Sequence, residues 1–111
     1  MANFFKSTTF NLTTTNLTTV LSIGTSAVAI VRTVQAVHDT SSNVDTDLYL
    51  KKSGGSDVQI SHAELNKSVV NLVENVLNLE GGDILKMQAD VANEITGQIS
   101  YLLIDRSQEN G

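Results

Sequence analysis

Val, Ile and Thr account for 31 of the 111 residues, and this excess of β-branched side chains constrains the fold more than any other feature of the sequence. Such side chains lose rotamer freedom in a helix but fit well on a pleated sheet. Proline is absent, so the turns must be formed by Gly, Asn, Asp and Ser. The composition therefore predicts an all-β domain.

Several segments alternate with the period of a β-strand. In residues 27–38 both faces carry apolar residues, which is typical of a central strand covered on both sides. Continuous alternation would place on one face Val28, Ile30, Arg32, Val34, Ala36 and His38. Residues 44–52 and 84–89 also alternate, and turn-forming residues separate these runs. We therefore predict a single-domain antiparallel β-sandwich of about seven to eight strands.

The stretch 61–80 has two competing interpretations. Ser61 to Glu64 fits a helix capping box, and the apolar residues that follow fall at spacings of three and four, which favours a short helix near 62–75. The same stretch is rich in Asn and Val, which are poor helix formers, and also divides into two short strands. The local pattern favours neither interpretation.

The segment NLTT occurs at residues 11–14 and again at 16–19. Because this period is odd, Leu12 and Leu17 would face opposite sides of one straight strand. Two short strands broken near Thr15 and Asn16 would let both leucines point inward. The Thr residues would then cover an outer face, either as an edge that pairs with another chain or as a polar lead-in with no partner.

Three of the five aromatic residues, Phe4, Phe5 and Phe10, precede the first well-defined strand. They either fold back onto the core of this domain or form an arm that docks on a neighbouring subunit. The candidate interface residues are Phe4, Phe5, Phe10, Leu12 and Leu17. The expected organisation is an N-terminal arm (1–11), a β-sandwich domain (12–105) and a flexible C-terminal tail (106–111).

Charge and composition argue against several classes of protein. The net charge of -5 and the scattered Lys and Arg residues argue against a nucleic-acid partner. The absence of cysteine excludes disulfides, thiolate metal sites and a Cys nucleophile. The stretch MANFFKSTTF has no long apolar run, so neither a signal peptide nor a membrane span is expected there.

No catalytic, cofactor-binding or metal-binding residues are predicted. The closest His–carboxylate neighbours in the sequence are His38 with Asp39 and His62 with Glu64. Sequence proximity alone assembles no acid–base pair, and no zinc ligand set accompanies the two histidines. We therefore expect a protein that is not an enzyme and that needs no cofactor.

Asp45 and Asp47 alternate along the segment NVDTD, as oxygen ligands of a hard cation do. Alternate Asp residues on a solvated strand face are also common. The glycine that allows an EF-hand loop to turn is missing, so a solvated face is favoured and a bound cation stays open at this point.

The order of segments resembles that of small β-sandwich virion proteins of tailed bacteriophages, notably of cyanobacterial and other marine phages. The resemblance rests on AVAIVRTVQAVHDTSS, VDTDLYLKKSGGSD and LNLEGGDILKMQADVANEITGQISYLLI, and it covers residues 17–105. Its most characteristic pieces are the GGD turn before ILKMQA and the final strand ending in SYLLI. In such proteins the stretch that matches 61–80 is a loop and two strands, often with a proline that this chain lacks.

The resemblance implies a structural function in the virion. The first expectation is a capsid decoration (cement) protein that stabilises a phage head, and the alternative is a neck, tail or fibre accessory protein. The expected partners are other virion proteins, including the major capsid protein, and further copies of this chain. A competing class is a carbohydrate- or receptor-binding module, for which Tyr49 and Tyr101 are the only candidate stacking rings outside the N-terminal segment.

Overall fold

The computed structural model describes residues 2–105, and every regular element in this range is a β-strand. The strands are β1 (Ala2–Leu12), β2 (Thr18–Ser22), β3 (Ala27–His38), β4 (Val44–Lys51), β5 (Asp57–Leu65), β6 (Ser68–Asn71), β7 (Leu77–Leu79), β8 (Ile84–Ala89) and β9 (Ile95–Asp105). The described residues contain no helix, and so no helix that is long and apolar enough to cross a membrane.

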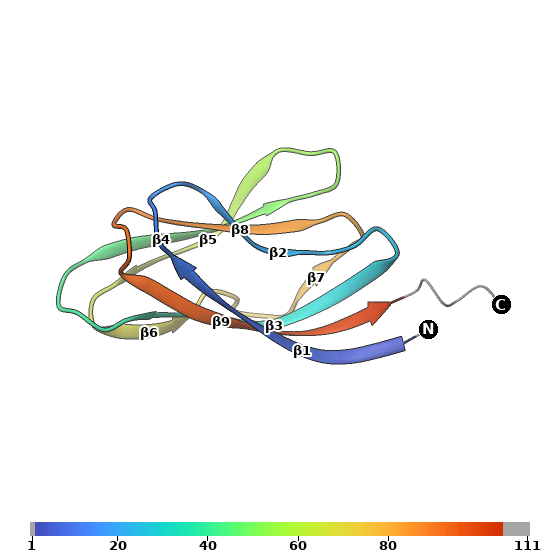
Figure 1. Cartoon of the computed structure of the whole chain (residues 1–111), viewed down its shortest axis with the longest axis horizontal. Coiled ribbons are helices and arrows are strands. Elements are labelled where there is room, and N and C mark those ends of the chain that lie inside the picture. The colour runs from blue at the N-terminus through green and yellow to red at the C-terminus, as the bar shows by residue number, and fades with distance from the viewer. Residues whose placement is uncertain (1, 106–111) are drawn as a thin grey trace.

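The strands form two antiparallel sheets that pack face to face (Figure 1). The larger sheet has the order β1-β9-β3-β6, and β7 also pairs with β3. The smaller sheet has the order β2-β8-β4-β5. The predicted all-β, single-domain sandwich is confirmed, with nine strands in the described residues. Figure 1 also shows that the tip of the β4–β5 hairpin, drawn in green, projects from the sandwich.

Strand β3 changes the face that it presents to the core at a β-bulge. As far as Val31 the odd-numbered residues are buried, whereas from Val34 onward the even-numbered ones are. The register with β9 shifts at this point and leaves Arg32 exposed at the extra position. The prediction of one continuous alternation over 27–38 was therefore wrong, because Val28 does not share the core face with Val34. The inserted residue allows Val31 and Val34 both to point into the core.

Residues 61–80 contain strands and no helix, so the short helix considered near 62–75 is wrong. Strand β5 continues to Leu65, while β6 and β7 both pair with β3. The Oδ1 atom of Asn71 accepts hydrogen bonds from the backbone N–H of Val34 (3.0 Å) and of Val73 (3.1 Å). Pairing with β3 thus satisfies the backbone of this stretch, and the local capping signal is overridden.

The N-terminal segment is part of the larger sheet. Strand β1 pairs with β9 from Ala2, opposite Asp105, to Leu12, opposite Ile95. The two NLTT copies are separated as predicted, because β1 ends at Leu12 and β2 begins at Thr18. The division into an arm, a domain and a tail stays a prediction. The predicted tail, 106–111, lies outside the described residues, as does residue 1.

A buried carboxylate joins two turns at one end of the sandwich. Asp83 is 1% exposed, and its Oδ2 atom accepts hydrogen bonds from Lys52 Nζ (2.6 Å) and from the backbone N–H of Glu80 (2.8 Å). The backbone N–H of Ser53 donates to Oδ1 (3.3 Å). Burial alone would raise the pKa of Asp83, but these hydrogen bonds outweigh it and hold the pKa below its ordinary value. The ionised side chain therefore fastens the β4–β5 turn to the β7–β8 turn.

Glycine is required at position 97 because three strands approach closely there. Gly97 of β9 lies opposite Phe10 of β1 and Ala36 of β3. A Cβ atom at this position would collide with the carbonyl oxygen of Gln35 and with the ring of Phe10. The Phe10 ring therefore occupies the space that a side chain on residue 97 would need, and this is how the ring becomes buried.

We predict that Asp83→Ala lowers the free energy of unfolding at neutral pH by about 1–3 kcal/mol, because buried N–H groups lose their acceptor. Chemical denaturation measures this change. The control is Asp57→Ala, which removes the Lys86–Asp57 ion pair (3.0 Å) at the surface and should cost less than about 1 kcal/mol.

The same effect should depend on pH. Because the pKa of Asp83 is lowered in the folded state, its stabilisation is complete above the ordinary carboxyl pKa and is lost as pH falls through the folded-state value. The difference in stability between the wild type and Asp83→Ala should shrink in acid. A difference that stays constant down to the acid limit of folding would contradict the ionised pair.

We predict that Gly97→Ala lowers the free energy of unfolding by about 1–3 kcal/mol, because either the Phe10 ring or the β3 backbone must move. The control is Gly24→Ala, where no atom lies within 4 Å of the added Cβ and the change should be within about 1 kcal/mol. Equal effects of the two substitutions in chemical denaturation would show that the close approach at residue 97 does not limit stability.

Candidate interaction surfaces

The structure divides the five predicted interface residues into two groups. Phe10 and Leu12 are buried in the core, and Leu17 is half-buried between β1 and β2. Phe4 is 45% exposed and Phe5 is 82% exposed. An interface role for all five stays a prediction, but only Phe4 and Phe5 offer substantial apolar surface to another molecule.

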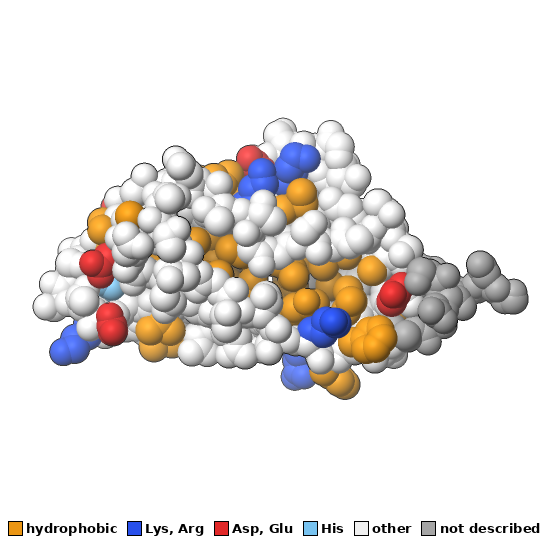
Figure 2. All heavy atoms as spheres, viewed as in Figure 1, with side chains coloured by type: hydrophobic (Ala, Val, Ile, Leu, Met, Phe, Trp, Pro, Cys, Tyr) orange, Lys and Arg blue, Asp and Glu red, His pale blue; other side chains and the backbone are white. Residues whose placement is uncertain are grey.

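Alternation along β1 explains this division. The even-numbered residues share the face of Phe10 and Leu12, which is packed against the smaller sheet, and the odd-numbered residues, including Phe5, face outward. Phe4 lies on the inward face near the free end of the strand, with the ammonium group of Lys6 5.6 Å from its ring centre. Figure 2 shows apolar side chains gathered between β1 and β2 toward this end of the molecule.

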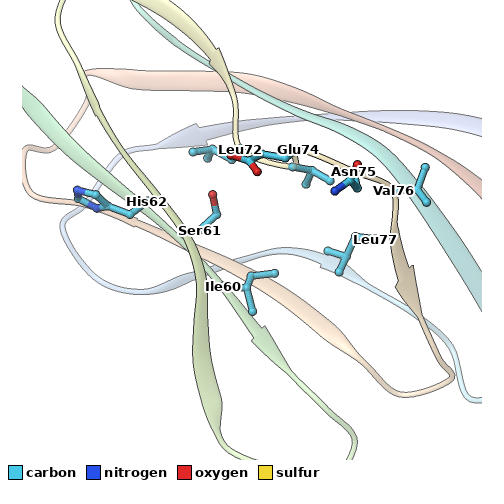
Figure 3. A pocket seen from close by; sticks show the side chains of 9 residues that line it. Ile60, Ser61, His62, Leu72, Glu74, Asn75, Val76 and Leu77 are labelled. Atoms are coloured by element: carbon cyan, nitrogen blue, oxygen red, sulfur yellow. The ribbon is translucent and has the colours of Figure 1, made fainter.

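A second surface lies on the opposite margin, where β5 faces the connection between β6 and β7. The hollow there has a volume of about 440 Å³, and Figure 3 shows side chains from both segments around it. Its apolar part includes Ile60, Leu77 and Val76, of which Val76 is 61% exposed. This surface was not predicted from the sequence. The available signal was the apolar pair Val58 and Ile60, which alternates with polar residues in the first half of β5; both side chains are exposed.

His62, at the rim of this hollow, pairs with a residue that sequence proximity did not suggest. Its Nδ1 atom lies 2.5 Å from Oδ1 of Asp47 on the neighbouring strand β4, whereas the pairing considered from the sequence was with Glu64. The hydrogen bond to Asp47 raises the pKa of His62, although partial desolvation opposes the rise. The pair is exposed to solvent, and it can hold a charge at the rim in mildly acidic conditions.

His38 serves the interior of the fold. Its ring is buried, with Nε2 2.8 Å from the carbonyl oxygen of Ser42 and Nδ1 3.3 Å from that of Glu94. The side chain of Glu94 also lies 3.6 Å from Nδ1, so the carboxylate near His38 is Glu94 and not Asp39. The ring therefore links the loop after β3 to the loop before β9, in an arrangement that fastens two loops.

The side chain of Asp47 has a partner within the fold, whereas Asp45 is held through its backbone. The backbone N–H of Asp45 donates to Oδ1 of Asp90 (3.0 Å), and Asp47 pairs with His62. Over residues 2–105, no group of three or more His, Cys, Asp or Glu residues is placed to hold a metal ion.

Comparison with known proteins gives a fold and no family. No family model matches the chain, and no match was found among curated proteins. Among solved structures, it is similar to a chain from the acid-stable capsid of Helicobacter pylori bacteriophage KHP30, with a TM-score of 0.60 and 10% identity over 96% of this chain and 90% of that chain. It is also similar to a chain from the disulfide-linked pili of Bacillus endospore appendages, with a TM-score of 0.53 and 10% identity over 92% of this chain and 84% of that one. At this identity the likeness shows the fold alone, a β-sandwich similar to that of a chain of a phage capsid and of a chain of a pilus.

We predict that Asp47→Asn lowers the pKa of His62 toward its ordinary value, because the hydrogen bond to Asp47 is the main cause of the raised pKa. Since the folded-state pKa is raised, the pair stabilises the fold below the ordinary His pKa, and this contribution is lost as pH rises through the folded-state value. NMR titration of the two histidines measures the change. The control is Asp39→Asn, because Asp39 is remote from His62 in the pairing of the strands, and the pKa of His62 should not change in this variant. An unchanged pKa of His62 in Asp47→Asn would refute the pairing of His62 with Asp47.

Proposed function

We propose that this chain is a non-enzymatic structural protein of a bacteriophage particle, and specifically a capsid decoration protein that contacts the major capsid protein. The proposal is supported by the fold, which is similar to a chain of a phage capsid and to a chain of a pilus. The alternative to a decoration protein on the head is an accessory protein of the neck, tail or fibre. Such a protein would use the same surfaces, and only the position of its copies on the particle would differ.

One observation carries the proposal: apolar side chains are exposed on both margins of a small sandwich. Phe4 and Phe5 lie on edge strand β1, and Ile60 and Val76 line the hollow at the other margin. Exposed apolar surface of this kind tends to be covered by a partner. Two such surfaces on opposite margins suit a subunit that is held between neighbours.

The mechanism is passive burial of these side chains against neighbouring subunits. Burying one large apolar side chain contributes about 1.5–3 kcal/mol relative to leaving it exposed, so a few such contacts give a modest affinity for each copy. A decoration protein repeats this contact at many symmetric positions. Where one copy touches two neighbours, the effective concentration of the second contact strengthens the attachment further.

The two histidines support a non-enzymatic role. A hydrolytic site needs a nucleophile, an oriented base and a pocket around both. His38 is enclosed by the loops that it fastens together, and His62 pairs with Asp47 at the solvent-exposed rim of an open hollow. Both arrangements are accounted for by structure alone.

Cryo-electron microscopy of particles from the virus that encodes this chain tests the proposal. We expect the sandwich on the outer surface of the head, repeated with the symmetry of the shell, with one margin of the molecule against the major capsid protein. Density only at the neck or tail would select the alternative position. Absence of the chain from purified particles would refute a structural virion role.

Charge substitutions at the hollow test which surface makes the contact. We predict that Ile60→Asp and Val76→Asp each reduce the occupancy of the chain on particles by about tenfold or more, since each loses the burial of one apolar side chain. The control is Val91→Asp, an equally drastic change at an exposed residue between β8 and β9. Equal occupancy of all three variants would exclude the hollow as the contact.

A further inference from the structure

The outer edge of β1 is unlike the other strand edges of the described fold. Exposed edges are usually protected by short length, bulges or charged residues. The edge strands β2, β6 and β7 are short, with five, four and three residues, and β2 also contains a bulge. Strand β5 is longer but has a bulge opposite β4 and carries Asp57, His62 and Glu64. In contrast, β1 has eleven residues in unbroken register with β9, and its only charged residue is Lys6.

The hydrogen bonds of the larger sheet establish which backbone groups of β1 point to that edge. Val34 faces β6, because its carbonyl oxygen accepts from Leu72 N–H (2.9 Å) and its N–H donates to Asn71 (3.0 Å). Backbone groups alternate along a strand, so Gln35 faces β9 and pairs with Gln98.

The same alternation continues from β9 to β1. Since Gln98 faces β3, Gly97 faces β1, and its partner Phe10 faces β9. The carbonyl oxygen of Leu12 agrees with this assignment, because it accepts a hydrogen bond from Asn93 N–H (2.9 Å) just before β9. The even-numbered residues of β1 therefore bond to β9. The odd-numbered residues direct their N–H and C=O groups to the free edge, and these residues are Asn3, Phe5, Ser7, Thr9 and Asn11.

We propose that two copies of this chain pair antiparallel through β1 about a two-fold axis at Ser7, joining their larger sheets into one continuous sheet. In this register Ser7 lies opposite Ser7 of the other copy, Phe5 lies opposite Thr9, and Asn3 lies opposite Asn11. The two-fold axis is at the centre of the eleven-residue strand, so the strand is paired along its whole length. The odd-numbered residues then form the hydrogen-bonded pairs, in phase with their outward-directed backbone groups.

Side chains favour this register over its neighbours. Phe5, which is 82% exposed, lies in each copy opposite Thr9 of the other, an aromatic and β-branched pair of the kind that stabilises neighbouring strands, and Lys6 lies opposite Thr8. Moving the axis to Lys6 would place two lysines directly opposite each other, which is unfavourable. Moving it to Thr8 would leave the first residues of β1 unpaired. A register that places odd-numbered residues opposite even-numbered ones would leave the outward N–H and C=O groups of each copy without matching partners. It would also place side chains of the inward face opposite side chains of the outward face.

This dimer goes beyond the proposed function and does not depend on it, because its evidence is the β1 edge and not the capsid similarity. It gives a geometry to the predicted self-association. It also leaves the hollow beside β5 free, because that surface lies on the opposite margin of each copy.

Cysteine cross-linking of the purified full chain tests the register, because the chain has no cysteine of its own. Residues in a hydrogen-bonded antiparallel pair lie about 5.5 Å apart between Cα atoms, within the range for a disulfide. Ser7→Cys should therefore form a disulfide-linked dimer under mild oxidation. Thr9→Cys is the matched control, since its two copies would be separated by four residues along the strands and should cross-link poorly.

Sedimentation velocity over a range of concentrations tests the dimer itself. The wild type should dimerise reversibly, and Ser7→Pro should weaken the dimer by about tenfold or more, because it removes one outward N–H donor from each copy. Thr8→Pro removes an N–H that bonds to β9 and should instead lower the melting temperature of the monomer.

Three outcomes would overturn the proposal. The first is a wild-type protein that stays monomeric at all concentrations with no Ser7→Cys cross-link. The second is a dimer cross-linked through Thr9→Cys in place of Ser7→Cys. The third is a dimer that Ser7→Pro leaves intact while the strand spectrum in circular dichroism is retained. None of these results would affect the test on virus particles, which examines the chain in its assembly.

Discussion

The fold depends on β9, because this strand pairs on both sides with the other long strands of its sheet. Its partners are β1 on one side and β3 on the other, and the three meet most closely at Gly97. The bulge at Arg32 adapts β3 to this arrangement by bringing Val31 and Val34 to the same face. Without that local change, the second half of β3 would present its polar side to the smaller sheet.

Two buried polar groups hold the turns at the ends of the sandwich. Asp83 fastens the β4–β5 turn to the β7–β8 turn, and His38 fastens the loop after β3 to the loop before β9. Both groups are satisfied by nearby partners, as buried polar atoms must be to avoid a large desolvation cost. The ends are thus fixed by polar contacts, and the large exposed apolar side chains other than Val91 lie on or beside the strands at the margins.

This distribution suits a protein that acts by contact. The margin at β1 offers an open strand edge with Phe5 beside it, and the margin at β5 offers an apolar hollow. The two surfaces differ in chemistry: an open edge selects another strand through its backbone, whereas a hollow selects the side chains of a partner. Under the two proposals made above, the β1 edge would join a copy of the chain and the hollow would join a different subunit.

The sequence alone determined the all-β class, the position of most turns and the inward residues of β4 and β8, because each follows from the two-residue period of a strand and from local turn chemistry. Only the tertiary structure decided the rest. Pairing with β3 turned 61–80 into strands, the bulge at Arg32 broke the expected alternation, and the partners of His62 and His38 came from other strands and loops. These features depend on contacts between residues far apart in the chain, and a local pattern contains no information about such contacts.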